Sequence, residues 1–157
     1  REAARLALLD GTDVIYLARY EASGRPRRVT GGIGDRFPAS ITATGKVMLA
    51  TLPAEAVEDR YRGKLLPRYT ERSIQSLPDL LRDLEAARDR GYAIDDEESA
   101  DSVVGIAVVV PTRGVRAPIL AISITTHKSD WSDAVRDRFV AELKRVANLL
   151  GNPMAVG

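Results

Sequence analysis

The chain has 157 residues, enough for one domain with a sizeable core, and its 45% hydrophobic and 29% charged residues are typical of a soluble globular protein. Its 23 basic and 22 acidic residues leave a net charge of +1, which argues against a DNA-binding surface, because such surfaces are usually basic. The absence of cysteine excludes disulfides and thiolate catalysis and fits a cytoplasmic location, and no apolar run approaches the roughly 20 residues that cross a bilayer.

The N-terminal part is predicted to begin with a β-hairpin. Two short β-prone runs at 6–9 and 14–18 flank a turn that starts Asp10-Gly11, a dipeptide favoured in tight hairpin turns. A short polar stretch at 27–30 is interpreted as an edge strand. Because the first residue is Arg1 and not Met, we expect the chain to be a fragment of a longer protein.

The stretch from Gly34 to Ala50 carries the main functional signal. Hydroxyl residues, Thr42 and Thr44, precede an apolar run and therefore indicate a helix start. The first N–H groups of a helix have no partner within it and suit a small anion such as a carboxylate. The small residues Ala43, Thr44 and Gly45 would let a ligand approach the backbone closely. A capped helix without a ligand is the plainer interpretation of the same residues.

The remaining helices are predicted from caps and from apolar spacing. Pro53 suits the first turn of a second helix, and Ser76 opens a capping box before a leucine stripe that runs to Gly91. A long last helix begins at Ser129 and is stopped at the C-terminal end by glycine and proline. Helices are thus predicted at 44–51, 54–61, 77–91 and 129–150.

Three further strands are predicted at 92–95, 103–110 and 119–126, and the last of them has two distinct faces. Leucine and isoleucine occupy one face, whereas Ala121, Ser123 and Thr125 occupy the other, as expected for a sheet with a core face and a cavity face. Paired strands with partly alternating helices favour the α+β class, with an antiparallel sheet flanked by helices in one domain over 1–157.

Several catalytic and metal-binding motifs are absent from the sequence. The Gly45-Lys46 pair lacks the first glycine and the Ser or Thr of a P-loop, and no dinucleotide-binding fingerprint is present. His127 is the only histidine, so a histidine-rich metal site is excluded and a catalytic triad has one candidate base. The acidic run at 95–98 lacks the alternating ligands of a calcium loop, and we expect Asp95 alone to point inward as an acceptor. We therefore expect no metal, no cofactor and no catalysis.

Four motifs in a fixed order resemble the signature of IclR-type (isocitrate lyase regulator) bacterial transcriptional regulators. They are Gly34-x-Arg36-x-Pro38 with Ala43-Thr44-Gly45-Lys46 and Leu49-Ala50; Tyr69-Thr70 with Ile74; Arg88-x-x-Gly91-Tyr92-Ala93-x-Asp95-x-Glu97-Glu98; and Ile106-Ala107 with Ala121-Ile122-Ser123-Ile124. The resemblance covers about residues 6–150 and concerns the C-terminal effector-binding domain of that family. It implies a GAF-like fold and the absence here of the family's N-terminal winged helix-turn-helix DNA-binding domain.

The resemblance also implies a site. A small organic or aromatic carboxylate would bind between the loop before the Gly-Lys helix and the cavity face of the sheet, and would change DNA binding through a dimer or tetramer. Asp95 would accept from a ligand hydroxyl or remain protonated beside a carboxylate. Motif by motif, the implied ligand-binding residues are Ala43, Thr44, Asp95, Val103, Gly105, Ser123 and Thr125. We also expect the ligand to contact Gly45 at the helix start and Phe37 as an apolar wall.

Two positions depart from the family pattern. Ser40 stands where many members have a histidine, and Gly105 stands where many have a cysteine, so a wider pocket is expected. Two other functions are compatible with the residues. A hydrolase would use Ser123 or Asp95 with His127, and an oligomerisation module without a ligand would have its cavity filled by side chains.

Overall fold

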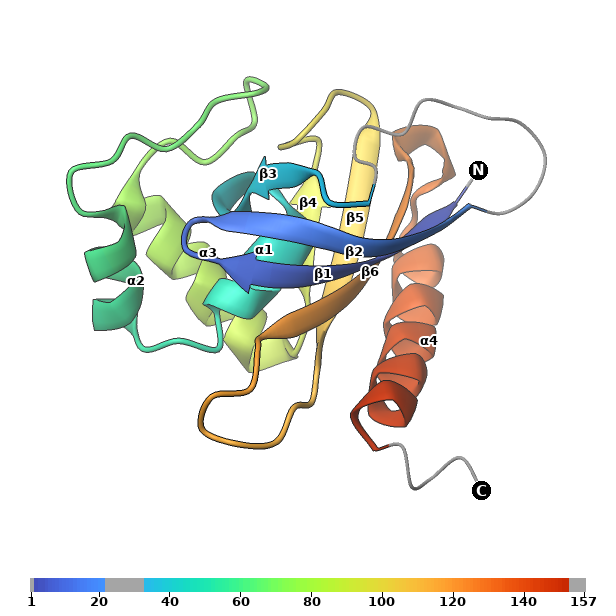
Figure 1. Cartoon of the computed structure of the whole chain (residues 1–157). Coiled ribbons are helices and arrows are strands. Elements are labelled where there is room, and N and C mark those ends of the chain that lie inside the picture. The colour runs from blue at the N-terminus through green and yellow to red at the C-terminus, as the bar shows by residue number, and fades with distance from the viewer. Residues whose placement is uncertain (1, 22–32, 153–157) are drawn as a thin grey trace.

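The computed structural model describes residues 2–21 and 33–152 (Figure 1). The predicted strand at 27–30 lies outside these residues. In chain order the elements are β1 (Ala3–Asp10), β2 (Asp13–Glu21), β3 (Arg36–Pro38), a 3₁₀ turn (Ala39–Ile41), α1 (Ala43–Leu49), α2 (Ala54–Tyr61), α3 (Leu77–Arg90), β4 (Ala93–Asp96), β5 (Val103–Val110), β6 (Leu120–His127), a second 3₁₀ turn (Lys128–Asp130) and α4 (Asp133–Gly151).

The strands form one six-stranded sheet in the order β3-β2-β1-β6-β5-β4. Every neighbouring pair in this order is antiparallel, and the hairpin predicted around Asp10-Gly11 joins β1 to β2. The α+β class with an antiparallel sheet flanked by helices is therefore confirmed. The N-terminal strand lies in the middle of the sheet, beside the C-terminal strand β6.

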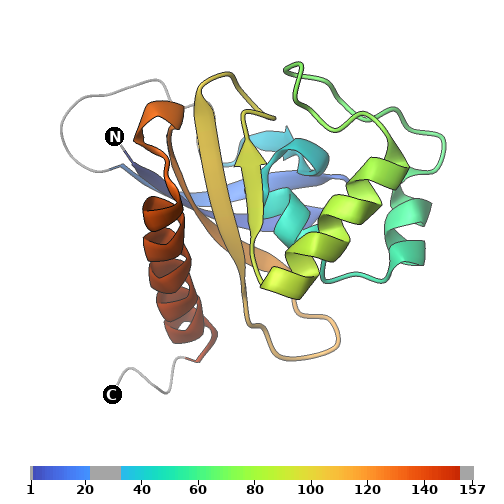
Figure 2. The ribbon, with the colours of Figure 1, turned by 180° about the vertical axis from the view of Figure 1, so that it is seen from behind.

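The two faces of the sheet bury separate cores. One face packs against α1 and α3, around Val14, Met48 and Leu84. The other packs against α4 alone, around Ile122 and Phe139. Figures 1 and 2 show α4 standing apart from the other helices, on the opposite side of the sheet. Because the side chains of a strand alternate between faces, each central strand serves both cores.

The helix caps explain where the helices begin. The Thr42 hydroxyl accepts from the Gly45 N–H, and the Ser76 hydroxyl accepts from the Asp79 N–H, as the sequence predicted for both starts. α1 begins one residue earlier and ends two residues earlier than predicted. The predicted start of the last helix at Ser129 is wrong, because the chain there forms a 3₁₀ turn and Ser132 caps α4.

From the sequence, the segment that forms β3 was expected to be a loop, because glycine, aspartate and proline surround it. It nevertheless pairs with β2, with Phe37 opposite Val14 and Arg36 opposite Ile15. This pairing holds the segment that leads into α1 against the sheet. It also fixes the Phe37 side chain, whose ring lies 5.7 Å from the ring of Tyr16.

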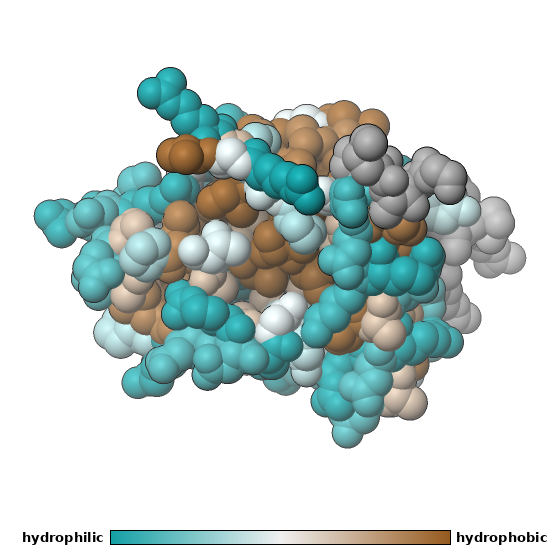
Figure 3. Space-filling model, turned by 90° about the horizontal axis from the view of Figure 1, so that it is seen from below, coloured by the Kyte–Doolittle hydropathy of each residue, from teal (hydrophilic) through white to brown (hydrophobic). Residues whose placement is uncertain are grey.

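None of the helices in residues 2–21 and 33–152 is both long and apolar enough to cross a membrane. Viewed from below, the molecule shows apolar patches interrupted by hydrophilic side chains (Figure 3). A hollow between α1, α3 and α4 is lined by small and apolar residues, among them Val47, Ala87 and Val108, with Lys144 and Arg88 at its polar side.

Candidate functional site

A cavity of ≈ 270 Å³ lies between the sheet and the start of α1. Its floor comes from β1, β6, β5 and β4, and its walls come from the segment that leads into α1 and the loop that joins β4 to β5. The lining residues are Ala3, Arg5, Tyr16, Phe37, Thr42, Ala43, Thr44, Asp95, Ser99, Ala100, Ser102, Val103, Gly105, Ser123, Thr125, Thr126 and His127. All the sequence-predicted site residues except Gly45 are among them.

The register of the sheet aligns the floor residues in a row that crosses four strands. Ala3 on β1 lies opposite Thr125 on β6, which lies opposite Gly105 on β5, which in turn lies opposite Asp95 on β4. Gly105 has no side chain, and a Cβ there would lie 3.2 Å from a methyl of Thr125 and 3.7 Å from Cβ of Asp95, so the floor is narrow at this point. In the next row, Arg5 on β1 lies opposite Ser123. The small polar face predicted for β6 is therefore the cavity face.

The start of α1 forms the opposite wall. The N–H of Gly45 donates to the Thr42 hydroxyl at 3.1 Å, and the N–H of Lys46 donates to the Thr42 carbonyl at 3.0 Å. Gly45 itself lies outside the cavity lining. A Cβ there would come within 2.3 Å of the Cα and the carbonyl oxygen of Ala39, so glycine is required for close backbone packing rather than for ligand access.

The Thr44 hydroxyl is buried at this wall. It makes no well-aligned hydrogen bond to the described residues, although it lies near the Tyr16 phenol. Burial raises the pKa of Tyr16, and the charge of Arg5 and the contact with Thr44 offset part of that rise. A buried polar atom without a well-placed hydrogen-bond partner is uncommon, so the Thr44 hydroxyl is suited to form a hydrogen bond with a ligand in the cavity.

Asp95 is 3% exposed and organises the turn that follows β4. Its Oδ1 accepts from the N–H of Glu98 at 2.8 Å and from the N–H of Ser99 at 3.1 Å, and its Oδ2 accepts from the Ser99 hydroxyl. Burial raises the pKa of Asp95 above its usual range, although these hydrogen bonds and the charge of Lys46 pull it down. The carboxyl group thus has a structural role as well as a place in the cavity.

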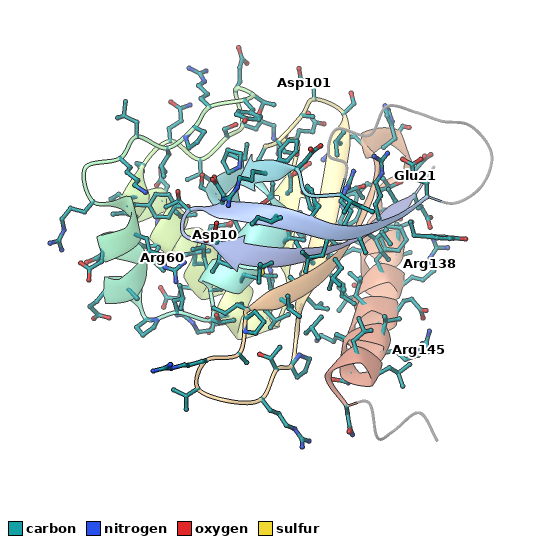
Figure 4. All side chains as sticks on the ribbon, viewed as in Figure 1. Asp10, Glu21, Arg60, Asp101, Arg138 and Arg145 are labelled. Atoms are coloured by element: carbon teal, nitrogen blue, oxygen red, sulfur yellow. The ribbon has the colours of Figure 1, made fainter. Side chains whose placement is uncertain are left out.

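The loop that contains Ser99 is held from outside the cavity. Thr70 Oγ1 donates to the Glu97 carbonyl at 2.6 Å, and Ser73 Oγ donates to the Glu98 carbonyl at 2.7 Å. Lys46 Nζ, from α1, lies 2.7 Å from a carboxylate oxygen of Glu98. Asp101, near the tip of this loop, lies at the edge of the molecule (Figure 4).

Glu97 and Ser102, at the two ends of this loop, have φ angles of 58° and 63°. Residues with side chains rarely adopt such angles, and strained backbone of this kind is common at functional sites.

Arg5 and Tyr16 are the main site residues that the sequence analysis missed. Arg5 is only 5% exposed, and its Nη1 donates to Thr125 Oγ1 at 3.0 Å. Its guanidinium carbon lies 5.3 Å from the centre of the Tyr16 ring. Burial lowers the pKa of Arg5, but a guanidinium remains a cation at neutral pH. The predicted strand began at Leu6, whereas β1 begins at Ala3, so Arg5 was not recognised as a strand residue that faces the core.

The geometry does not support a Ser–His catalytic pair. Ser123 and His127 are both on β6 and are separated by four residues, which is roughly 13 Å along a strand. His127 Nδ1 instead lies 2.7 Å from the Ser129 hydroxyl and accepts from the Ser129 N–H. Asp95 is engaged in its own turn. The described part of the chain also holds no cluster of histidine and acidic residues suited to a metal ion.

The fold is an α+β domain with a cavity between its sheet and α1, and comparison with known proteins gives the family. Residues 1–151 match the family model described as the bacterial transcriptional regulator IclR C-terminal domain. The chain therefore belongs to the IclR family and is an effector-binding domain with that family's GAF-like fold. The family consists of transcriptional regulators rather than enzymes, so the hydrolase alternative is not supported.

Individual relatives agree with this assignment. The chain is 33% identical over 141 residues to the transcriptional repressor AllR of Klebsiella pneumoniae, covering 90% of this chain and 50% of AllR. It is 33% identical over 155 residues to the transcriptional regulator KdgR of Escherichia coli, covering 98% and 58%. It thus spans about half the length of these relatives.

A solved structure shows the same fold with a ligand. The inducer-binding domain of a double mutant of the transcription factor PobR from Acinetobacter, in complex with 3-hydroxybenzoic acid, superposes with a TM-score of 0.83 at 28% identity. The match covers 96% of this chain and 87% of that one.

Proposed function

We propose that this domain senses a small organic or aromatic carboxylate, which binds in the cavity between α1 and the sheet. The observation that supports this most directly is the cavity itself. It is walled by the positions that the family resemblance implied, including Thr44, Asp95 and Ser123, and it is not filled by side chains. A cavity of this size falls just below the roughly 300–1,000 Å³ of drug-sized sites and therefore suits a small molecule.

The PobR complex supports the same ligand class, since that related domain binds an aromatic hydroxy acid. We also infer that ligand binding biases two conformations of a homodimer or tetramer, and thereby changes DNA binding by a winged helix-turn-helix domain elsewhere in the full-length protein. Large apolar side chains that remain exposed, such as Tyr20 and Leu150, are compatible with self-association. A ligand-free oligomerisation module would not need an open cavity, so we favour the sensor.

A thermal-shift screen of small carboxylates tests this proposal. At 1,000 times Kd, a ligand adds about 4 kcal/mol to the free energy of unfolding. For a domain of this size, that corresponds to a rise in Tm of roughly 8–16 °C. Ser123→Leu, which fills the floor of the cavity, should abolish the shift, whereas Ala86→Leu on the exposed face of α3 should preserve it.

If Ser123→Leu responds like the wild type, the ligand binds elsewhere. A separate experiment, sedimentation velocity with and without the best ligand, tests whether ligand binding changes the size or the stability of the oligomer.

A further inference from the structure

We propose that the loop at 97–102, which joins β4 to β5, is a gate of the cavity, and that release of a proton from Glu98 loosens this gate. Entry to the cavity is then faster at alkaline pH than at acidic pH. The proposal concerns access to the cavity rather than the identity of what binds there, so its test needs no ligand.

The loop closes one side of the cavity. Ser99, Ala100 and Ser102 are among the lining residues, so displacement of the loop opens the cavity on this side. The loop lies beside the connection between α2 and α3 (Figure 1). Its two end residues, Glu97 and Ser102, have the positive φ angles described above. The closed position therefore holds the backbone in an unfavourable conformation, which opening relieves.

Few contacts hold the loop closed. Its sequence, Glu-Glu-Ser-Ala-Asp-Ser, contains no large apolar side chain. Its outer attachments are single polar contacts, from the Thr70 and Ser73 hydroxyls to carbonyls of the loop and from Lys46 to the Glu98 carboxylate. Because opening exposes little apolar surface, it costs less free energy than unfolding of the sheet.

The contact at Lys46 belongs to a cluster with too few cations. The ammonium of Lys46 lies 2.7 Å from Glu98 Oε2 and 2.7 Å from Asp83 Oδ2, and its charge also acts on Asp95. One buried cation thus faces three carboxyl groups. Unbalanced charge is costly in a site shielded from water, so the closed loop is favoured when one of the three carries a proton.

Glu98 is the carboxyl group that best accommodates this proton. Burial also raises the pKa of Asp95, but Asp95 accepts three hydrogen bonds from its own turn, and these stabilise its charged form. The side chain of Asp83 is 31% exposed, so water solvates its charge, whereas that of Glu98 is 12% exposed. Burial raises the pKa of Glu98 to about 7, with Asp95 and Asp83 adding to the rise and Lys46 opposing it.

Other charged side chains near the loop do not neutralise Glu98. Arg72 lies 2.8 Å from one carboxylate oxygen of Asp96, and Lys128, at the end of β6, lies 2.5 Å from the other. Asp101 adds a like charge to the loop itself.

Ionised Glu98 is therefore better stabilised in water than in the closed loop. When the loop opens, the pKa of Glu98 falls toward its ordinary value of 4.5, so opening becomes easier as the pH rises from 4.5 to 7.

Hydrogen exchange at backbone amides measures this opening. The N–H groups of Glu98 and Ser99 both donate to Asp95 Oδ1 and lose these bonds when the loop moves away. Their protection factors, which correct for the intrinsic effect of pH, should fall about 20-fold between pH 5.5 and 7.5. The N–H of Arg136, bonded to the Ser132 carbonyl in the first turn of α4, should keep its protection factor. Loop amides that exchange as slowly as those of the core strand β5 would overturn the proposal.

Three variants assign the effect to Glu98. Glu98→Gln, which cannot ionise, should show constant loop protection, whereas Glu85→Gln on the exposed face of α3 should respond like the wild type. Asp83→Asn removes a like charge and should move the fall in protection to lower pH; it also serves if Glu98→Gln does not fold. A wild-type response in Glu98→Gln, or no shift to lower pH in Asp83→Asn, would contradict the role of Glu98.

A thiol probe tests whether opening reaches the cavity. The chain has no cysteine, so Ala100→Cys places a single thiol in the cavity wall. Its reaction with methyl methanethiosulfonate, corrected for the thiolate fraction, should accelerate over the same pH range. Ala134→Cys, exposed on α4, should react at a constant corrected rate. A constant rate at Ala100→Cys while the loop amides respond would show that the loop moves without opening the cavity, which would refute the gate but not the proposed function.

Discussion

Lys46 Nζ lies 2.7 Å from Glu98 Oε2, and this contact joins the helix at one wall of the cavity to the loop at the other. Lys46 is only 1% exposed, and Asp83 on α3 lies 2.7 Å from the same ammonium group. Because Glu98 follows Asp95 by three residues, the position of the cavity loop depends on this buried cation. The loop, α1 and α3 are therefore expected to move as one unit.

Replacing Lys46 by methionine should destabilise the domain strongly. The substitution keeps the length of the side chain but leaves two carboxylates facing each other without a cation. We expect a loss of about 3–5 kcal/mol in the free energy of unfolding, measured by urea denaturation. Lys64→Met, at an exposed position, should change it by less than about 0.5 kcal/mol. Equal stability of the two variants would show that the buried ion pairs contribute nothing.

The pH dependence of stability should report on Glu98. Burial raises the pKa of Glu98 to about 7, with neighbouring Asp95 and Asp83 adding to the rise and Lys46 opposing it. The unfolded chain releases this proton near its ordinary pKa of 4.5, so the folded state binds more protons between pH 4.5 and 7. The contribution is therefore fully present below pH 4.5 and is lost as the pH rises through 7.

We expect the contribution of Glu98 to fall by an amount on the order of 2–3 kcal/mol across this window. Urea titrations at a series of pH values measure it as the difference between the wild type and Glu98→Gln. Glu85→Gln, on the exposed face of α3, is the matched control and should follow the wild type. If Glu98→Gln has the same pH profile as the wild type, the carboxyl group titrates normally in the folded state.

Gly45→Ala should disrupt the entry into α1. The added methyl group would lie 2.3 Å from backbone atoms of Ala39, which no rotamer change can relieve. We expect a loss of at least about 3 kcal/mol, or an insoluble product, judged by circular dichroism and urea denaturation. A Gly45→Ala variant of wild-type stability would mean that the chain before α1 shifts freely.

Gly105→Ala makes the same chemical change in a different setting. Its methyl group would lie 3.2 Å from a methyl of Thr125 and 3.6 Å from Cβ of Ala43, contacts that small side-chain shifts can accommodate. We expect stability within about 1 kcal/mol of the wild type but affinity for the best carboxylate reduced about tenfold, because the methyl group occupies the floor of the cavity. Calorimetric titration measures this, and undiminished affinity would place the ligand away from Gly105.

Most of the fold could be predicted from the sequence because local signals were strong. The hairpin at Asp10-Gly11, the cap at Ser76 and the alternation of β6 each follow from short-range chemistry. β3 could not be predicted, because a three-residue strand forms only through its pairing with β2. The start of α4 was misplaced because Ser129 and Ser132 are both suitable caps, and only the 3₁₀ turn decides between them.

Many of the residues that line the cavity were predicted from the sequence, but the charged residues around it were not. The small residues of α1 and β6 were found because their pattern is local and resembles a known family. Arg5 was missed because its role depends on Thr125, 120 residues away, across a strand pairing that the sequence does not state. Of the acidic run at 95–98, only Asp95 was expected to point inward, and only the position of Lys46 shows that Glu98 is enclosed as well.

The alternation along β6 separates two tasks within one strand. Ser123 and Thr125 face the cavity, whereas Ile122 and Ile124 pack toward α4. A substitution that alters what the domain detects therefore leaves the hydrophobic contacts of α4 untouched. Cavity-facing residues of β6 can therefore change during evolution, or be changed by a protein engineer, without loss of the packing between β6 and α4.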